Sequence, residues 1–169
     1  MDEDQAALRF AASRPGKAAL CTVVGIEGTF SRRLGAQLAI DLDGTTAGSL
    51  SDGCLERELA TQSAEARSTG TARLLRYGQG SPIIDFRLPC GSGLDILVEP
   101  APDRDAMAAT VAALDSRTEA VLTLPVERSD LLQQRRYLPS PRLVVFGAGP
   151  TPANPERCGE WPFAHRRRR

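Results

Sequence analysis

The sequence predicts an α/β fold, a mixed sheet with flanking helices, and two observations support this class. First, 169 residues with 41% hydrophobic and 25% charged residues are typical of a globular protein with one main core. Second, two apolar patterns alternate along the chain. Short apolar runs typical of strands are separated by stretches in which apolar residues recur at helical spacing. Such an alternation is typical of a sheet covered by helices.

The first predicted elements are a helix and a central strand. Residues 5–14 have one apolar face, and the Pro-Gly pair that follows them ends the helix. Residues 18–27 are apolar on both faces, which is typical of a central strand. Strict alternation in this strand places Ile26 on the same face as Val24, and Cys21 on the opposite face.

The later elements follow from turn signals and apolar spacing. An Asp-Gly pair at 43–44 predicts a tight turn between two short strands, and Asp103 is predicted to cap a helix. The polar, proline-containing stretch 126–141 is predicted to be a linker. In chain order, these elements are strands at 36–41 and 46–48, a helix at 54–68, strands at 71–77 and 94–99, a helix at 103–115 and a strand at 120–124.

The end of the chain departs from this pattern. An apolar strand at 142–146 leads into Gly-Ala-Gly, which opens a dinucleotide-binding unit, but Pro152 stands at the third position of that fingerprint. The remaining residues are too few to complete such a unit, so NAD binding is not expected. The prediction is a cofactor-binding domain at 1–125, the linker at 126–141, an orphan first strand of an incomplete Rossmann-like domain at 142–149 and a disordered tail at 150–169.

Charge and hydropathy exclude several classes of function. The 21 basic and 21 acidic residues cancel, whereas a nucleic-acid binder needs a basic excess. Apolar runs of about 20 residues, which a membrane helix requires, are missing from the sequence. The acidic amino terminus does not resemble a signal peptide, so a cytoplasmic location is expected. The orphan strand predicts self-association, because an unpaired apolar strand can pair with a second copy.

The segment 48–56 is the strongest candidate for a chemical site. It places small residues, including Ser51 and Gly53, directly before a helix, where free backbone N–H groups favour an anion. Cys54 falls in the first turn, where the pKa of a thiol is lowered. This position suits a nucleophile, a persulfide carrier or a soft-metal ligand. It equally suits a helix cap at Ser51 or Asp52 beside a buried thiol.

Two further segments are candidates. Cys90 is a thiol followed by Gly91 in a glycine-rich loop, which is either a second reactive site or an incidental cysteine. Arg32 and Arg33 lie between two strands and can clamp a phosphate or carboxylate, or can simply be solvated. The one histidine lies in the tail, so a catalytic triad lacks its base. Cys21 is expected to be an inert core thiol.

These residues resemble the xanthine dehydrogenase accessory protein family, XdhC/CoxI. Three blocks, in order, account for the resemblance, which covers about residues 5–149: VVGIEGTFSRRLGA at 23–36, GSLSDGCLE at 48–56 and CGSGLDILVE at 90–99. Asp52 and Ser92 replace glycines that are usual in the family. Family members continue with a Rossmann-like domain, so the resemblance implies that this chain is truncated near residue 149.

The resemblance implies a chaperone of the molybdenum cofactor (molybdopterin) and not an enzyme. Such proteins bind the cofactor transiently, protect it, support its sulfuration with a cysteine desulfurase, and deliver it to a xanthine dehydrogenase-type molybdenum hydroxylase. By resemblance, Cys54 and Cys90 would contact molybdenum or its sulfur, and Arg32 and Arg33 would face the phosphate or pterin. Two alternatives remain open: a sulfur-transfer or redox protein with a persulfide on Cys54, and an inactive truncated fragment.

Overall fold

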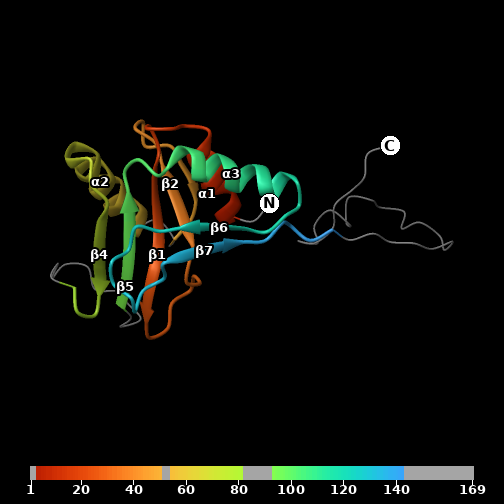
Figure 1. Cartoon of the computed structure of the whole chain (residues 1–169). Coiled ribbons are helices and arrows are strands. Elements are labelled where there is room, and N and C mark those ends of the chain that lie inside the picture. Colours follow the sequence, from red (N-terminus) through yellow and green to blue (C-terminus); the bar gives the residue numbers. More distant parts are fainter. Residues whose placement is uncertain (1–2, 51–53, 82–92, 143–169) are drawn as a thin grey trace, which may run out of the picture.

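The computed structural model describes residues 3–50, 54–81 and 93–142, which form three helices and seven strands (Figure 1). In chain order, the elements are α1 (Glu3–Ala12), β1 (Ala19–Glu27), β2 (Gln37–Ile40), β3 (Thr46–Gly48), α2 (Cys54–Thr69), β4 (Arg73–Gly78), β5 (Gly93–Glu99), α3 (Arg104–Asp115), β6 (Ala120–Thr123) and β7 (Gln134–Tyr137). All but β7 lie within about two residues of a predicted element. Asp103 caps α3 as predicted, because its side chain accepts a hydrogen bond from the Ala106 N–H at 2.8 Å.

The main sheet has five strands in the order β3-β2-β1-β5-β4, with β1 at its centre. Every strand pairing in the described residues is antiparallel. The predicted α/β class with flanking helices is confirmed, but the described sheet is antiparallel and not mixed, because its neighbouring strands all run in opposite directions. A second sheet, formed by β6 and β7 alone, crosses the strands of the main sheet in Figure 1.

The two faces of the main sheet are covered by different elements. Alternation along the strands separates them, since Leu38 and Ile40 join one core cluster while Ala39 joins another. Leu55 and Leu59 of α2 pack on the first face, which we call the α2 face. On the second face, called the hairpin face, lie α1, α3 and the β6–β7 pair. Both layers bury apolar side chains, which is the main favourable contribution to folding.

A bulge in β1 corrects one prediction. The pairing of β1 with β5 shifts register between Val23 and Gly25, so Val24 is an extra residue in β1. Beyond the bulge, alternation resumes with the opposite phase. Ile26 therefore packs against the α2 face together with Cys21, while Val24 joins a cluster on the hairpin face. The prediction that Ile26 shares a face with Val24 is wrong, because a bulge reverses the period-two pattern.

The stretch 126–141 is packed and does not behave as the predicted linker. It contains β7, and it buries Leu131 and Tyr137, which are 8% and 2% exposed. The Leu132 N–H donates to the Val24 carbonyl at 2.8 Å, so this stretch also uses the bulge in β1. The prediction was wrong because the stretch is mostly polar, although two buried side chains, Leu131 and Tyr137, are enough to pack it against the hairpin face. Residues 143–169, including almost all of the predicted orphan strand and the predicted tail, lie outside the described residues.

Within the described ranges, no helix combines the length and the apolar character needed to cross a bilayer.

Candidate functional site

The connections that carry the three sequence blocks are directed toward one end of the main sheet, the lower end in Figure 1, which we call the loop end. Here β1 and β4 finish and β5 begins, because Glu27 and Gly78 both pair with Gly93. β3 runs in the same direction but finishes earlier, since Gly48 pairs with Leu38, and Leu38 pairs with Cys21 in the middle of the sheet. The connections after β1, β3 and β4 therefore all leave their strands toward the loop end, although they are far apart in sequence.

Arg32 physically links the first block to the second. Its Nη2 donates to Ser49 Oγ at 3.0 Å, and its Nη1 donates to Glu3 Oε2 at 2.8 Å. Arg32 is partly exposed, and Arg33 beside it is exposed. The structure thus places the predicted arginine pair in the connection between β1 and β2, with Arg32 beside the segment that leads into α2.

The segment that leads into α2 is constrained at its start. Gly48 has a φ of +84°, and a Cβ here would overlap the Gln37 carbonyl and the Ala7 side chain, so only glycine fits. The Leu50 N–H donates to Glu56 Oε1 at 3.2 Å, so a side chain in the first turn of α2 reaches back to the backbone before the helix. This contact fixes where the helix begins relative to the sheet.

Cys54 is the first residue of α2, as the sequence predicts. A thiol at a helix start lies near the positive end of the helix dipole, which favours the thiolate. The Cys54 side chain and the candidates Ser51, Gly53, Cys90 and Gly91 lie outside what the structure describes. Their roles therefore stay predictions.

The hairpin face supplies an anchor for the arginine connection that the sequence did not reveal. Arg135 of β7 donates from Nε to the Gly35 carbonyl at 2.7 Å, and its guanidinium lies over the Tyr137 ring, 4.8 Å from the centroid. Gly35 has a φ of +82°, and a Cβ here would lie 2.8 Å from Arg135 Cδ. Gly35 is a detectable turn signal, but Arg135 lies in a polar stretch that had been predicted to be a linker.

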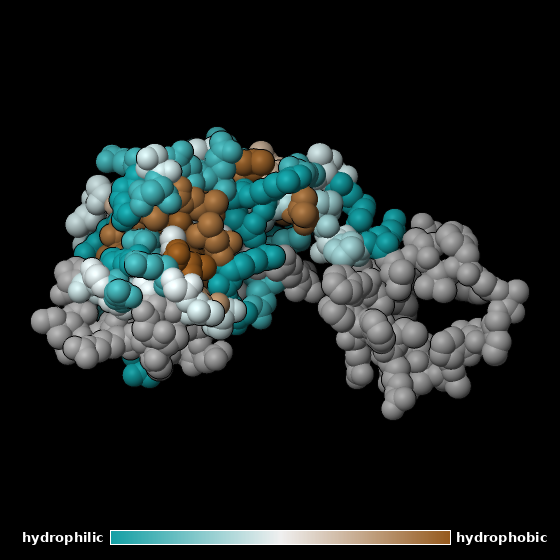
Figure 2. Space-filling view, turned by 90° about the horizontal axis from the view of Figure 1, so that it is seen from below, coloured by the Kyte–Doolittle hydropathy of each residue, from teal (hydrophilic) through white to brown (hydrophobic). Residues whose placement is uncertain are grey.

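Apolar surface accompanies the arginines at the loop end. Figure 2, which views the molecule from below Figure 1, shows an apolar area bordered by hydrophilic residues. Ile26 and Phe30 are partly buried against the α2-face core, and Leu34 is 46% exposed. The β1–β2 connection thus presents apolar and cationic side chains close together. This combination suits an anion that also carries an apolar or aromatic part.

The core thiol behaves as predicted. Cys21 is fully buried, and burial raises the pKa of its thiol to about 12, so it is neutral at physiological pH. Its Sγ lies 3.7 Å from Ser63 Oγ. Among the described residues, no group of three or more His, Cys, Asp and Glu side chains could hold a metal ion.

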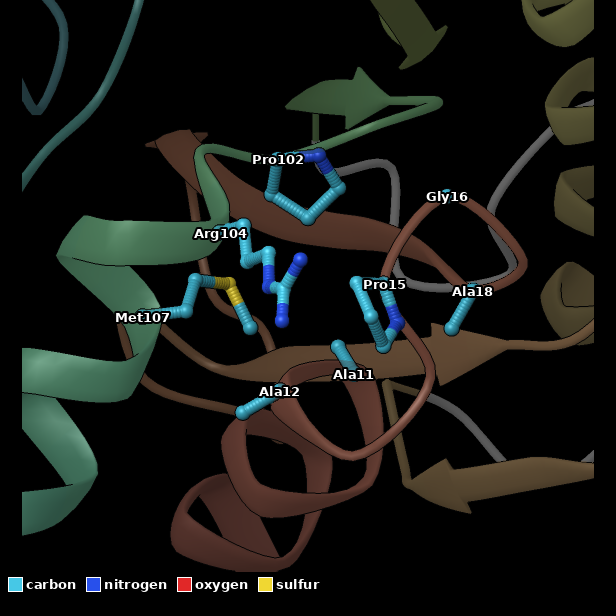
Figure 3. Close-up of a pocket in the computed structure, with 8 residues that line it drawn as sticks. All are labelled: Ala11, Ala12, Pro15, Gly16, Ala18, Pro102, Arg104 and Met107. Atoms are coloured by element: carbon cyan, nitrogen blue, oxygen red, sulfur yellow. The ribbon is translucent and has the colours of Figure 1, made fainter.

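A small pocket lies away from the loop end, between the end of α1 and the start of α3 (Figure 3). Pro15, Arg104 and Met107 are among the residues that line it. Its cavity volume of about 10 Å³ is close to what a single water molecule needs. The pocket is too small for a cofactor and is not a candidate site.

Comparisons with known proteins agree with the sequence blocks. The model of the XdhC and CoxI family matches residues 11–78. The molybdenum cofactor insertion chaperone PaoD of Escherichia coli is 38% identical over 163 aligned residues, which cover 86% of this chain and 51% of PaoD. The chain thus spans about half the length of this curated relative.

A solved structure supports the fold. A protein from Bacillus halodurans, described as a xanthine dehydrogenase, superposes with a TM-score of 0.71 at 21% identity, over 89% of this chain and 56% of that one. At this identity the likeness establishes the fold alone. The family match over residues 11–78 and the identity to PaoD show that this chain is similar to the XdhC and CoxI family in the part that contains the first two blocks.

Proposed function

We propose that this chain is a molybdenum cofactor chaperone that binds molybdopterin at the loop end of its sheet. The main supporting observation is the contact between Arg32 and Ser49, which brings the arginine pair beside the entry to α2. PaoD, which is 38% identical to this chain over the aligned residues, is named a molybdenum cofactor insertion chaperone. The chain would act by sequestering and transferring the cofactor and not by turnover, so we propose no enzymatic activity.

The residues present fit an anionic, thiophilic cofactor. Arg32 and Arg33 offer guanidinium donors suited to a phosphate, and the start of α2 favours negative charge. The thiols of Cys54 and Cys90 are the kind of ligand that a soft metal centre prefers. Ser51, Gly53 and Gly91 would allow the cofactor to approach the backbone. When bound, the cofactor would supply the phosphate and the molybdenum centre that these groups recognise.

Binding of a phosphate to Arg32 would cost free energy, because it would break the ion pair between Arg32 and Glu3. Its carboxylate accepts a hydrogen bond from Arg32 Nη1, and both side chains are partly exposed. A phosphate that binds Arg32 bidentately would displace this carboxylate. Exposed ion pairs contribute roughly 0–1 kcal/mol, so displacing Glu3 would reduce the free energy gained on cofactor binding by no more than that amount. Glu3 would then act as an exchangeable partner that keeps Arg32 oriented before the cofactor arrives.

The wider role that we propose follows the family. The chain would protect the cofactor in the cytoplasm, support its sulfuration together with a cysteine desulfurase, and deliver it to a xanthine dehydrogenase-type molybdenum hydroxylase. We keep self-association through the 142–146 strand as a further prediction. Light scattering that finds a monomer would contradict this last point.

Binding of isolated molybdopterin cofactor tests the proposal. The variants are Arg32→Gln, Cys54→Ala and Cys90→Ala, and the matched control is Arg73→Gln, which alters an arginine of β4 paired with Glu65 on α2. We expect weaker binding in the first three variants and unchanged binding in the control. Binding that survives both cysteine substitutions would show that the thiol assignment is wrong. A wild-type chain that does not bind the cofactor would overturn the proposed function.

A second function is favoured by the position of Cys54 at the start of α2. A thiol activated there could carry a persulfide supplied by a cysteine desulfurase. Mass spectrometry after incubation with a desulfurase and cysteine, without molybdenum, separates the two functions. A carrier gains one sulfur on Cys54 under these conditions, whereas a chaperone that only sequesters the cofactor does not.

A further inference from the structure

Arg76, on the edge strand β4, is the centre of a charged network that the sequence analysis did not single out. Its Nη1 donates to Asp95 Oδ2 at 2.7 Å, and its Nη2 pairs with Glu27. The Asp95 side chain is only 5% exposed, so its charge needs a close partner. Arg128 is more distant, at 3.5 Å from Asp95 Oδ1, and is half exposed. Arg76 is therefore the main partner of this buried carboxylate.

Two glycines in the family blocks make room for this network. A Cβ on Gly93 would overlap the guanidinium group of Arg76, and a Cβ on Gly25 would lie 2.7 Å from Asp95 Oδ2. Neither glycine has a positive φ, so backbone conformation does not explain either of them. The close approach of Arg76 explains Gly93, and the close approach of Leu131 and Asp95 explains Gly25. The Arg76–Asp95 pair thus contributes to the packing of three strands, β1, β4 and β5.

The same arginine touches both ends of the connection between β4 and β5. Its Nε donates to the Gln79 carbonyl at 2.8 Å, just after β4 ends. Its guanidinium lies against Gly93, the first residue of β5. The residues between these two anchors include Cys90 and Gly91, the third block of the proposed site. The position of both anchors therefore depends on where the Arg76 side chain is held.

We propose that Arg76 is a positioning residue that fixes the two described ends of the β4–β5 connection, Gln79 and Gly93, which flank Cys90 in the sequence. The bearing of this role on cofactor binding rests on the proposed function. Arg76 acts through its bonds to Asp95, Glu27 and the Gln79 carbonyl and need not touch the cofactor. Lysine cannot replace it, because one ammonium group lacks the planar fork that makes these bonds together.

Hydrogen exchange on the full chain tests this role without any cofactor. The variants are Arg76→Gln, Arg76→Lys and Gly93→Ala, and the control is Arg73→Gln on the same strand. We expect amides at the described ends of 79–93, residues 79–81 and 93, to exchange about tenfold faster in the three variants, roughly the factor that follows from losing one charge-assisted hydrogen bond. Amides in α2 and all amides of the control should exchange at the wild-type rate.

Gly93→Ala keeps every charge and changes only the space available to the guanidinium, so it separates positioning from charge neutralisation. If residues 79–81 and 93 exchange at the wild-type rate in Gly93→Ala and Arg76→Lys, the proposal is overturned. It is equally overturned if α2 accelerates as much as these residues, because this would indicate a general loss of stability.

Cofactor affinity provides the link to function. We expect Arg76→Gln and Gly93→Ala to weaken molybdopterin binding several-fold. Unchanged affinity alongside faster exchange at 79–81 and 93 would overturn the role of Arg76 in binding. If the wild-type chain binds no cofactor, the proposed function fails, and the exchange result still decides whether Arg76 positions the connection.

Discussion

The two faces of the main sheet are buried to a similar degree but are held in different ways. The α2 face is a largely apolar cluster, on which the hydroxyl of the buried Ser63 lies 3.7 Å from the thiol of Cys21. The hairpin face buries a chain of polar groups. Tyr137 Oη donates to Gln37 Oε1 at 2.5 Å, and Gln37 Nε2 donates to Thr22 Oγ1 at 3.0 Å.

This difference shows how each face obtains its specificity. Apolar packing is non-directional, so the α2 face needs only side chains of suitable volume. A buried polar chain needs each partner at hydrogen-bonding distance. On the hairpin face the partners are remote in sequence, because Tyr137 and Gln37 are separated by 100 residues. We therefore expect volume changes to matter most on the α2 face, and the loss of single polar atoms to matter most on the hairpin face.

The largest effect should come from a cavity on the α2 face. Leu59 is fully buried in the α2-face cluster. Leu59→Ala should lower the free energy of unfolding by about 2–5 kcal/mol, through lost burial and the cavity left behind. Urea unfolding measures this loss. Leu74→Ala, on an edge strand and 41% exposed, is the control and should cost under about 1 kcal/mol. Equal costs at the two positions would contradict the assigned packing.

Glu99 should give the hairpin face a pH dependence. This glutamate is 8% exposed, and burial raises the pKa of its carboxyl from 4.5 to about 7. Because the folded state holds the proton more tightly than the unfolded state, stability falls as pH rises from about 4.5 through about 7 and stays low above it. Glu99→Gln should remove this loss and add up to about 3 kcal/mol at pH 8, with little effect below pH 4.5.

Urea unfolding at pH 5 and pH 8 checks the Glu99 prediction. The matched control is Glu127→Gln, since Glu127 is exposed and its substitution should leave the difference between the two pH values unchanged. If Glu99→Gln shows the same difference between pH 5 and pH 8 as the wild type, the burial of a carboxyl at Glu99 is not the source of the pH dependence.

The polar chain itself can be broken by one atom. Tyr137→Phe removes the hydroxyl that donates a hydrogen bond to Gln37 Oε1. It keeps the aromatic ring, so the side-chain volume changes little. We expect a loss of about 1–2 kcal/mol, the usual cost of removing a partner from a buried polar group. Thermal or urea unfolding gives the value. A loss below about 0.3 kcal/mol would mean that the hairpin face tolerates polar deletions as well as the α2 face does.

The smallest effect should come from the corresponding polar deletion on the α2 face. Ser63→Ala removes a hydroxyl that lies 3.7 Å from the weakly polar thiol of Cys21. A thiol is readily buried without a hydrogen bond, so the change should stay within about 0.5 kcal/mol. Denaturant unfolding in parallel with Tyr137→Phe compares the two faces directly. A larger loss for Ser63→Ala than for Tyr137→Phe would reverse the comparison.

Prediction from the sequence succeeded where a local pattern was sufficient. The helix beginning at Cys54 and the turn before β3 were predicted correctly, because small residues, caps and apolar spacing act within a few residues. The bulge at Val24 was missed because alternation alone does not reveal an inserted residue. Strand β7 was missed because Gln134–Tyr137 is polar, and its stability depends on distant partners.

The residues of the candidate site also fall into two groups, those with a local sequence signal and those without one. The sequence identified Arg32, Cys54 and Cys90 from residue type and neighbouring glycines. It did not identify Arg76 or Arg135, because an arginine on a strand has no local signal for the carboxylate or carbonyl that it binds. Only the pairing of β1 with β5 brings Asp95 opposite Gly25 and within reach of Arg76.

By itself, the sequence determined the order of the elements, the family blocks and the chemistry available at each block. These depend on short-range propensities and on residue type. Only the tertiary structure decided that the connections carrying the blocks leave toward one end of the sheet, that the stretch 126–141 packs on one face, and that Arg76 and Arg135 bond to backbone carbonyls in two of these connections. The physical reason is that strand register and buried ion pairs join residues far apart in the chain, and such contacts exist only once the sheet has formed.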